Sequence, residues 1–304
     1  MDNKNLVFLI SAAYSGGTLF SILMNQHPKI SSDGEIFPYI RGSAVGCSCG
    51  KEQIECEYYR TVAKHMLKKN KQNYDYGVFY YVPKYSNYYP LSRAFEGFWM
   101  SEIAKKLRNF FCFSIPKFRK LEQEFVSFHL EFFSNSLKLR NAIVYFDGTK
   151  SVRRAEFFAE RKLTSRIIHL IRDGRAFCNS FLKNKNLDRE YLPVAAKVWE
   201  KSIKKMDILK KRFPFIEVLD VRYNDLSADP KKELKRIFDF LDLSYDDSYL
   251  VYKKDDMHIL GNRMRFNYSG TIREDLSWKK ELGQNDVLLA NRLMGKNLKR
   301  FKFL

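Results

Sequence analysis

The residues most able to bind an anion lie in a glycine-rich turn near the start of the chain. Residues 6–10 are an uninterrupted apolar run, which is the pattern of a strand buried on both faces. This run leads into Ser15, Gly16, Gly17 and Thr18, and a helical pattern follows. A glycine-rich turn before a helix exposes backbone N–H groups at the helix N-terminus, where an anion is favoured. The turn predicts a phosphate or sulfate site, with an ordinary tight turn as the alternative.

Further polar residues follow other predicted strands. Residues 166–171 form a second apolar run that ends at Arg172, and Ser180 comes eight positions later. Another strand ends in Arg222-Tyr223, and a strand over residues 142–146 is followed by Lys150. Ligands of open α/β sheets bind outside the carboxyl ends of the strands. These side chains are therefore placed where a site is expected.

The elements that must position these residues alternate between strands and helices. This alternation predicts an α/β fold whose mainly parallel sheet has helices on both faces. A helix over residues 193–211 should bury Val194, Val198, Met206 and Leu209 on one side. Phenylalanines at helical spacing predict a further core-facing helix over residues 119–139; they are Phe125, Phe128, Phe132 and Phe133. Residues 40–90 show no regular pattern.

The chain is strongly basic, with 54 Lys and Arg against 35 Asp and Glu in 304 residues, a net charge of +19. Such a charge suits nucleic acid, an anionic membrane or a multiply charged small anion. No nucleic-acid motif is present, and no stretch is long and apolar enough to span a bilayer. The first residues lack the features of a signal peptide. We expect a cytoplasmic protein that has no nucleic-acid partner and no transmembrane segment.

The order and spacing of these motifs resemble the sulfotransferases that use 3′-phosphoadenosine 5′-phosphosulfate (PAPS). The similarity rests on the first loop, on Arg172 with Ser180, on the stretch that begins at Arg222-Tyr223, and on a terminal G-N-x-x-R. It implies the P-loop-like sulfotransferase fold over residues 1–304 as one domain, with a variable acceptor-side insertion at about 40–140. It also implies PAPS as donor and adenosine 3′,5′-bisphosphate (PAP) as product.

The resemblance assigns most of the cofactor-binding residues. The first loop is expected to bind the 5′-phosphosulfate, and Arg172 with Ser180 the 3′-phosphate. The expected cofactor-binding residues are Ser15, Gly16, Gly17, Thr18, Leu19, Arg172, Ser180, Tyr223, Gly261, Asn262, Arg263 and Arg265. A Walker A loop would carry a lysine after its second glycine, and its absence here argues against an ordinary P-loop NTPase.

Glu35, Tyr14 and Lys150 are expected to act in catalysis. Members of the family usually carry Lys or Arg before the loop serine, whereas this chain has Tyr14. Lys150 and Arg265 are the candidates to supply the missing charge. The pairs His27-Pro28 and Gly34-Glu35 resemble a pattern of protein-tyrosine sulfotransferases that marks a catalytic glutamate. We expect Glu35 to be the general base, with a helix-capping carboxylate as the alternative.

The acceptor is expected to carry a hydroxyl group, on a tyrosyl peptide, a sugar, a lipid or a small molecule. A tyrosine-rich segment, residues 73–90, either lines the acceptor groove or packs on the surface. Two alternatives to a sulfotransferase are a basic nucleic-acid-binding protein and a catalytically silent nucleotide-binding relative.

Three of the five cysteines cluster in the sequence at Cys47, Cys49 and Cys56. A structural zinc site needs four ligands, and the nearest candidate for the fourth, His65, has a spacing typical of no known motif. We therefore expect no metal, and a disulfide is disfavoured in a reducing cytosol. Cys112 and Cys178 are expected to be buried as small apolar residues.

Overall fold

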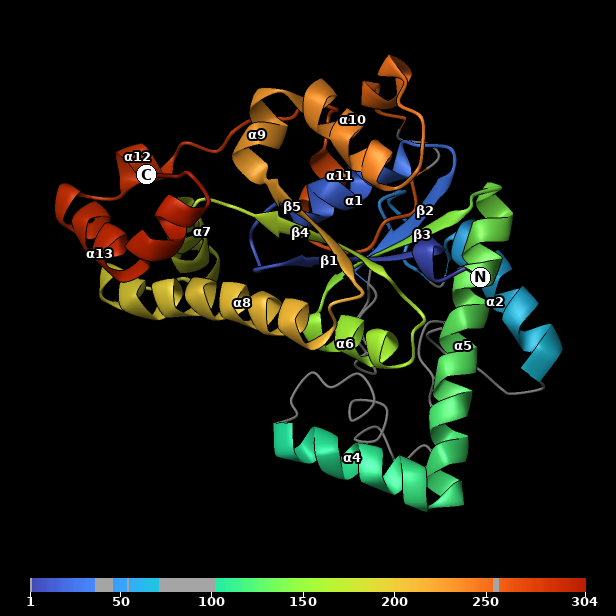
Figure 1. The fold of residues 1–304 in the computed structure, drawn as a ribbon. Coiled ribbons are helices and arrows are strands. Elements are labelled where there is room, and N and C mark those ends of the chain that lie inside the picture. Colours follow the sequence, from blue (N-terminus) through green and yellow to red (C-terminus); the bar gives the residue numbers. More distant parts are fainter. Residues whose placement is uncertain (1, 36–45, 54, 71–101, 254–256) are drawn as a thin grey trace.

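A parallel five-stranded sheet lies at the centre of the structure (Figure 1). The structure is a computed structural model that describes residues 2–35, 46–53, 55–70, 102–253 and 257–304. The strands lie in the order β2-β3-β1-β4-β5, and every neighbouring pair is parallel. They are β1 (Leu6–Ser11), β2 (Ile30–Gly34), β3 (Val144–Lys150), β4 (Arg166–Ile171) and β5 (Glu217–Arg222). The predicted parallel sheet is confirmed.

Helices cover both faces of the sheet, as the alternating pattern predicts (Figure 1). One face carries α1 (Gly17–Asn25), α9 (Tyr223–Ala228), α10 (Pro230–Phe240) and α11 (Met264–Asn267). The other carries α6 (Val152–Glu160) and α8 (Leu192–Arg212), with α5 (Pro116–Arg140) near β2. The remaining described helices are α2 (Glu57–Asn70), α4 (Glu102–Ser114), α7 (Gly174–Lys185), α12 (Trp278–Glu281) and α13 (Gln284–Arg300), with short 3-10 turns η1 (Asn3–Asn5), η2 (Arg189–Tyr191) and η3 (Asp247–Leu250).

The central strand β1 divides the core into two layers. Its six residues are all buried, and alternate side chains point to opposite faces of the sheet. Phe8 packs with the phenylalanines of α5 and α6, whereas Leu9 packs with α1 and α10. The α5 phenylalanines predicted to be core are confirmed; Phe125, Phe128, Phe132 and Phe133 are each at most 4% exposed. Cys112 and Cys178 are also buried.

A buried carboxyl group lies in β2 beside the aromatic core. Asp33 is fully buried and accepts hydrogen bonds from Ser136 of α5, at 2.9 Å, and from the hydroxyl of Tyr145 of β3, at 3.0 Å. Burial raises the pKa of Asp33 to about 6, against the opposing effect of these hydrogen bonds. The group is therefore expected to ionise near neutral pH.

Two expectations about local structure need correction. Val194 and Val198 are 49% and 38% exposed, because α8 turns Ala195, Trp199 and Ile203 toward α7 and α13 instead. The buried stripe is thus displaced by one position, although Met206 and Leu209 lie in it as expected. Part of the stretch expected to be irregular forms the helix α2.

The tyrosine-rich segment 73–90 lies outside the described residues. Among the described helices, none combines the length and the apolar character that a membrane span requires.

Candidate functional site

A cleft of about 510 Å³ opens at the carboxyl edge of the sheet. Residues at or just after the carboxyl ends of all five strands meet there with a loop from the last fifth of the chain. The cleft is lined by Ala13, Tyr14, Gly16, Gly17, Thr18, Leu19, Glu35, Lys150, Arg172, Ser180, Asn184, Tyr223, Gly261, Asn262 and Met264. Most of the residues singled out in the sequence therefore come together in one place.

The turn between β1 and α1 presents backbone amides to this cleft. The first intrahelical hydrogen bond runs from the amide of Phe20 to the carbonyl of Gly16, at 2.9 Å. The amides of Gly17, Thr18 and Leu19 lie ahead of that bond at the positive end of the helix dipole. Gly16 has a left-handed φ of 87°, and a Cβ there would lie 2.4 Å from the ring of Tyr223. Glycine is therefore required at this position.

Arg172 binds the turn from the end of β4. One guanidinium nitrogen donates to the carbonyl of Tyr14 at 2.5 Å and to the hydroxyl of Ser180 at 3.1 Å. A second nitrogen pairs with the carboxylate of Asp275 at 2.7 Å. The Asp275 side chain is 44% exposed, whereas that of Arg172 is 9% exposed. Arg172 and Ser180 are thus neighbours, as their spacing suggests, and Arg172 is also paired with a carboxylate.

A lysine and a glutamate face each other at the N-terminus of α1. The Lys150 amine donates to Oε1 of Glu35 at 2.5 Å, and both side chains are largely buried. The hydroxyl of Thr18 also contacts Oε1, at 3.2 Å. Lys150 lies against the loop as well, because a Cβ on Gly17 would come within 2.6 Å of its side chain. The cleft therefore contains a cation and a carboxylate, side by side, at the helix N-terminus.

The segment that carries Gly261 and Asn262 closes one side of the cleft. The amide of Asn262 donates to the hydroxyl of Thr18 at 3.2 Å. Glu35 and Leu260 join this segment to the end of β2, because the amide of Glu35 donates to the carbonyl of Leu260 at 2.9 Å. Gly261 has a φ of 146°, and a Cβ there would meet Thr18 and Glu35. The segment is therefore held tightly against α1.

Some of the expected site residues do not line the cleft. Arg265 is buried, and its guanidinium donates to the carbonyl of Gly46 at 2.7 Å and to that of Gly261. Its role in this arrangement is to hold the loop. Arg263 is exposed, and Ser15 is buried. Neither is among the residues that line the cleft.

Four residues near the cleft had no signal in the sequence. Ala13, Asn184 and Met264 line it, and Asp275 pairs with Arg172. Asn184 follows Ser180 by one turn of α7, which places both residues on the cleft. Asp275 lies far from Arg172 in the chain and belongs to no motif.

The three clustered cysteines are joined by a histidine other than the expected one. Their sulfur atoms and a ring nitrogen of His258 all lie within 4.8 Å of one another. His65, the candidate from the sequence, is exposed on α2 and is not part of this group. The cluster lies outside the cleft lining, on the segment that leads to Gly261.

Comparisons with known proteins agree with this architecture. Residues 118–247 match the model of the sulfotransferase family. The sulfotransferase domain of the Synechococcus PCC 7002 olefin synthase superposes with a TM-score of 0.52 at 15% identity, covering 97% of this chain and 96% of that one. A sulfotransferase domain from the curacin biosynthetic pathway gives 0.49 at 15% identity, covering 97% and 98%.

A mouse sulfotransferase, SULT7A1, solved in complex with PAP, gives a TM-score of 0.44 at 12% identity, covering 98% of this chain and 85% of that one. A search of curated protein sequences found no match. Residues 118–247 thus resemble the sulfotransferase family, and the chain has the fold of a sulfotransferase domain.

Proposed function

We propose that this protein is an enzyme that transfers a sulfuryl group from PAPS to a hydroxyl acceptor. The observation that carries the proposal is the cleft itself. A single cavity at the carboxyl edge of the sheet is lined by the loop amides, by an Arg–Ser pair and by a Lys–Glu pair. These groups are far apart in the sequence. PAPS carries two separate anionic groups, the 5′-phosphosulfate and the 3′-phosphate. Each of them can be bound by one of these separate sets of hydrogen-bond donors.

The residues that line the cleft fit the two ends of such a donor. The amides of Gly17, Thr18 and Leu19 are placed to hold the 5′-phosphosulfate, because a helix N-terminus stabilises an anion. Arg172 and Ser180 are placed to hold the 3′-phosphate through charge-assisted hydrogen bonds. Gly16 keeps the Tyr223 ring in contact with the turn, where the ring can pack against the nucleoside.

When bound, PAPS supplies an activated sulfuryl group whose anhydride oxygen leaves with the nucleotide. The acceptor oxygen forms the new bond to sulfur as the bond to that leaving oxygen breaks, by analogy with in-line phosphoryl transfer. Lys150 then stabilises the charge that develops on the leaving oxygen, together with the loop amides. It supplies the cation that Tyr14 lacks.

Glu35 is proposed to accept the proton of the acceptor hydroxyl. Within the described part of the chain, Thr18 and Lys150 both donate to Oε1 of Glu35. Oε2 is therefore left for the acceptor.

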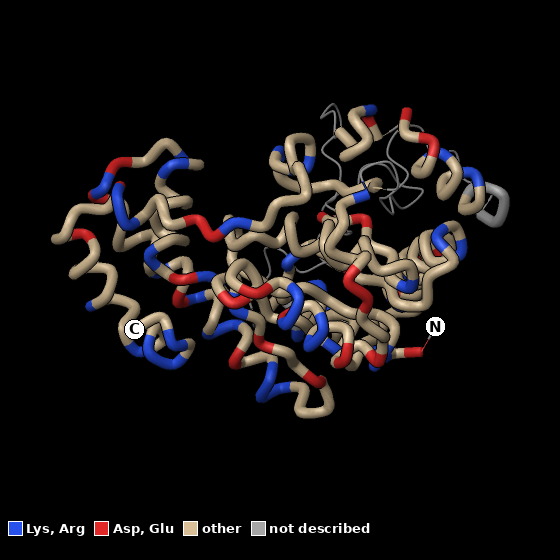
Figure 2. The backbone as a smooth tube through the Cα atoms, turned by 90° about the horizontal axis from the view of Figure 1, so that it is seen from above, with Lys and Arg blue, Asp and Glu red and all other residues tan. Residues whose placement is uncertain are grey.

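The basic charge is distributed differently from that of a typical nucleic-acid-binding protein. Figure 2 shows Lys and Arg interleaved with Asp and Glu along the backbone. Several of the basic side chains are paired, as in Arg166 with Asp242 and Lys210 with Asp220. A nucleic-acid-binding surface would gather unpaired cations on one face. The arrangement favours a small anionic ligand.

Binding and transfer can be tested separately. PAP should raise the melting temperature more than AMP, which lacks the 3′-phosphate, and about 2.7 kcal/mol of stabilisation is expected at 100 times Kd. Sulfate transfer from labelled PAPS should then be measured against a panel of phenols, sugars, alcohols and tyrosyl peptides. Equal stabilisation by PAP and AMP would contradict the assignment of the 3′-phosphate site. PAP binding without transfer to any acceptor would favour a catalytically silent relative.

A further inference from the structure

Three cysteines and one histidine form a compact group beside the cleft. Cys47 and Cys49 lie in one turn, Cys56 immediately precedes α2, and His258 comes from the segment that leads to Gly261. All five cysteines of the chain are free thiols in the structure. Two parts of the chain that are about 200 residues apart in sequence thus contribute one set of donor atoms.

The distances within this group fit a tetrahedral metal site. With Zn–S bonds of about 2.3 Å and Zn–N bonds of about 2.0–2.1 Å, tetrahedral geometry requires about 3.8 Å between sulfurs and about 3.6 Å between sulfur and nitrogen. The Cys56 sulfur lies 3.8 Å from that of Cys49 and 3.7 Å from that of Cys47. Nδ1 of His258 lies 3.6 Å from the Cys47 sulfur and 3.2 Å from the Cys56 sulfur. The two remaining donor–donor separations, which join Cys49 to Cys47 and to His258, are within 4.8 Å. A single ion therefore needs only small movements of the donor atoms.

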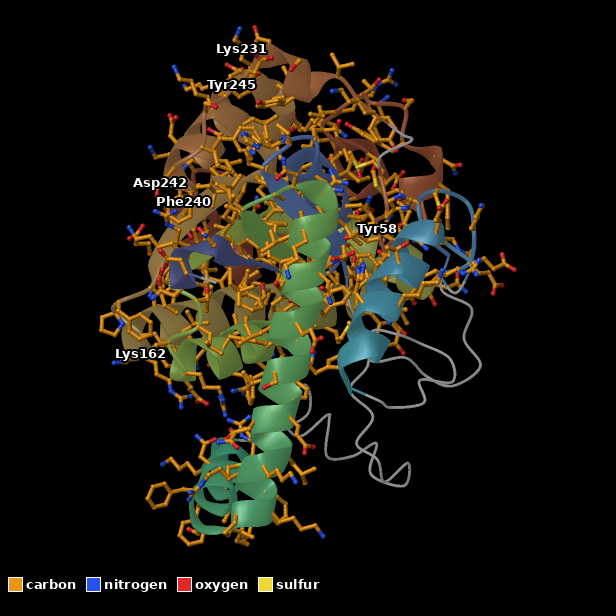
Figure 3. All side chains as sticks on the ribbon, turned by 90° about the vertical axis from the view of Figure 1, so that its right-hand side faces the viewer. Tyr58, Lys162, Lys231, Phe240, Asp242 and Tyr245 are labelled. Carbon is orange, nitrogen blue, oxygen red and sulfur yellow. The ribbon has the colours of Figure 1, made fainter. Side chains whose placement is uncertain are left out.

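The surrounding structure holds the donors in place. Gly50, with a left-handed φ of 91°, donates its amide to the carbonyl of Cys47 at 2.9 Å, which closes the turn between the first two cysteines. The Tyr58 ring is stacked on the His258 ring with 4.8 Å between centroids, and Tyr59 donates to the His258 carbonyl at 2.6 Å. Figure 3 shows Tyr58 at the start of α2, on the side toward α5.

We propose that Cys47, Cys49, Cys56 and His258 bind one zinc ion. Three thiolates and an imidazole are ligands that zinc prefers, and four protein ligands leave no open position for a substrate. The site is therefore structural. A disulfide between two of the cysteines would leave the third thiol and the imidazole without a role in this arrangement.

The ion would fix the segment that closes the cleft. Ser48 lies between the first two cysteines and contacts both sides of His258: its hydroxyl donates to the carbonyl of Met257 at 2.8 Å, and its amide donates to that of Ile259 at 3.1 Å. Gly261 follows three residues after the histidine ligand. The metal would thus join the cysteine turn to the Gly261 segment. This proposal does not depend on the reaction that the cleft performs.

The test is the metal content of the whole protein, produced without a metal-affinity tag and dialysed in the presence of a thiol reductant. Mass spectrometry of the metal should give one zinc per chain. Cobalt substitution should produce the visible bands of tetrahedral Co²⁺ together with thiolate-to-cobalt charge-transfer bands. His258→Cys, which keeps four ligands, should retain the metal, whereas His258→Ala should lose most of it. Cys112→Ala removes a thiol outside the cluster and should retain zinc.

The cobalt spectrum of the parent protein decides the proposal even if a variant fails to fold. Absence of zinc together with absence of the tetrahedral cobalt bands would overturn it. A disulfide found among the three cysteines of freshly purified protein would also overturn it, and so would one equivalent of iron in place of zinc. Equal loss of zinc in His258→Ala and Cys112→Ala would refute the choice of ligands.

Discussion

Asp275 occupies the position on Arg172 where we propose that the 3′-phosphate of the donor binds. Its carboxylate lies 2.7 Å from a guanidinium nitrogen of Arg172. The carboxylate and the 3′-phosphate cannot both bind that nitrogen at the same time. The donor must therefore displace this carboxylate. Replacing Asp275 with Asn removes the competing charge, while the amide oxygen can still accept the hydrogen bond that the amide of Ser277 donates to Oδ1 at 3.0 Å.

The size of the effect follows from the exposure of the pair. Burial raises the pKa of Asp275, but the hydrogen bonds from Ser277 and the charge of Arg172 more than offset this and lower it, so the group is charged at neutral pH. An ion pair with one partner 44% exposed belongs with surface pairs, which contribute about 0.2–1 kcal/mol. PAP should therefore bind Asp275→Asn roughly 1.4- to 5-fold more tightly than it binds the parent protein.

Titration calorimetry with PAP and with AMP measures this directly. The gain should be confined to PAP, because AMP has no 3′-phosphate, and it should shrink as salt is added. Asp246→Asn, which makes the same change of charge at the N-cap of η3, is the matched control and should leave both affinities unchanged. An equal gain for AMP, or weaker PAP binding by Asp275→Asn, would refute the placement of the 3′-phosphate on Arg172.

Three further substitutions test the site and the core. Arg172→Ala should weaken PAP binding by about 10- to 150-fold and largely remove the preference over AMP, as calorimetry would show. Glu35→Gln should keep PAP affinity but reduce turnover by about 10²–10⁴-fold, and transfer at the parent rate would exclude Glu35 as the base. Burial raises the pKa of Asp33 to about 6 from 3.8, so its contribution to stability is lost as pH rises through this range. Urea unfolding should show Asp33→Asn gaining about 2.4 kcal/mol relative to the parent between pH 4 and pH 7, and a constant difference would contradict the buried charge.

Two neighbouring strands of the sheet, β1 and β4, were predictable because each is a short apolar run followed by a polar turn. The run at residues 166–171 coincides with β4, and the run at 6–10 gives all but the last residue of β1. The face of α8 was harder to predict, because Val194 and Ala195 are both apolar and periodicity alone does not choose between adjacent stripes. The buried face of α8 is set by Trp199, which packs under Arg172. The indole N–H of Trp199 donates to the Arg172 carbonyl at 3.0 Å.

The site was predictable where a residue follows a strand, as Lys150 and Arg172 do, since the fold itself brings strand ends together. Arg265 shows the limit of this reasoning. Its place in a motif near the cleft does not tell whether the guanidinium faces a ligand or the backbone, and in the structure it binds carbonyl groups. His258 was missed as a partner of the cysteines because only the tertiary fold brings it to Cys56.

The central position of β1 affects the order in which the protein can fold during synthesis. β1 leaves the ribosome first, but its neighbours in the sheet begin only at Val144 and Arg166. Until then, a six-residue apolar strand has both edges unpaired, which exposes it to association with other chains. Slower elongation through residues 12–143 should therefore increase aggregation of nascent chains. The cleft is completed later still, once the segment around Gly261 has been made.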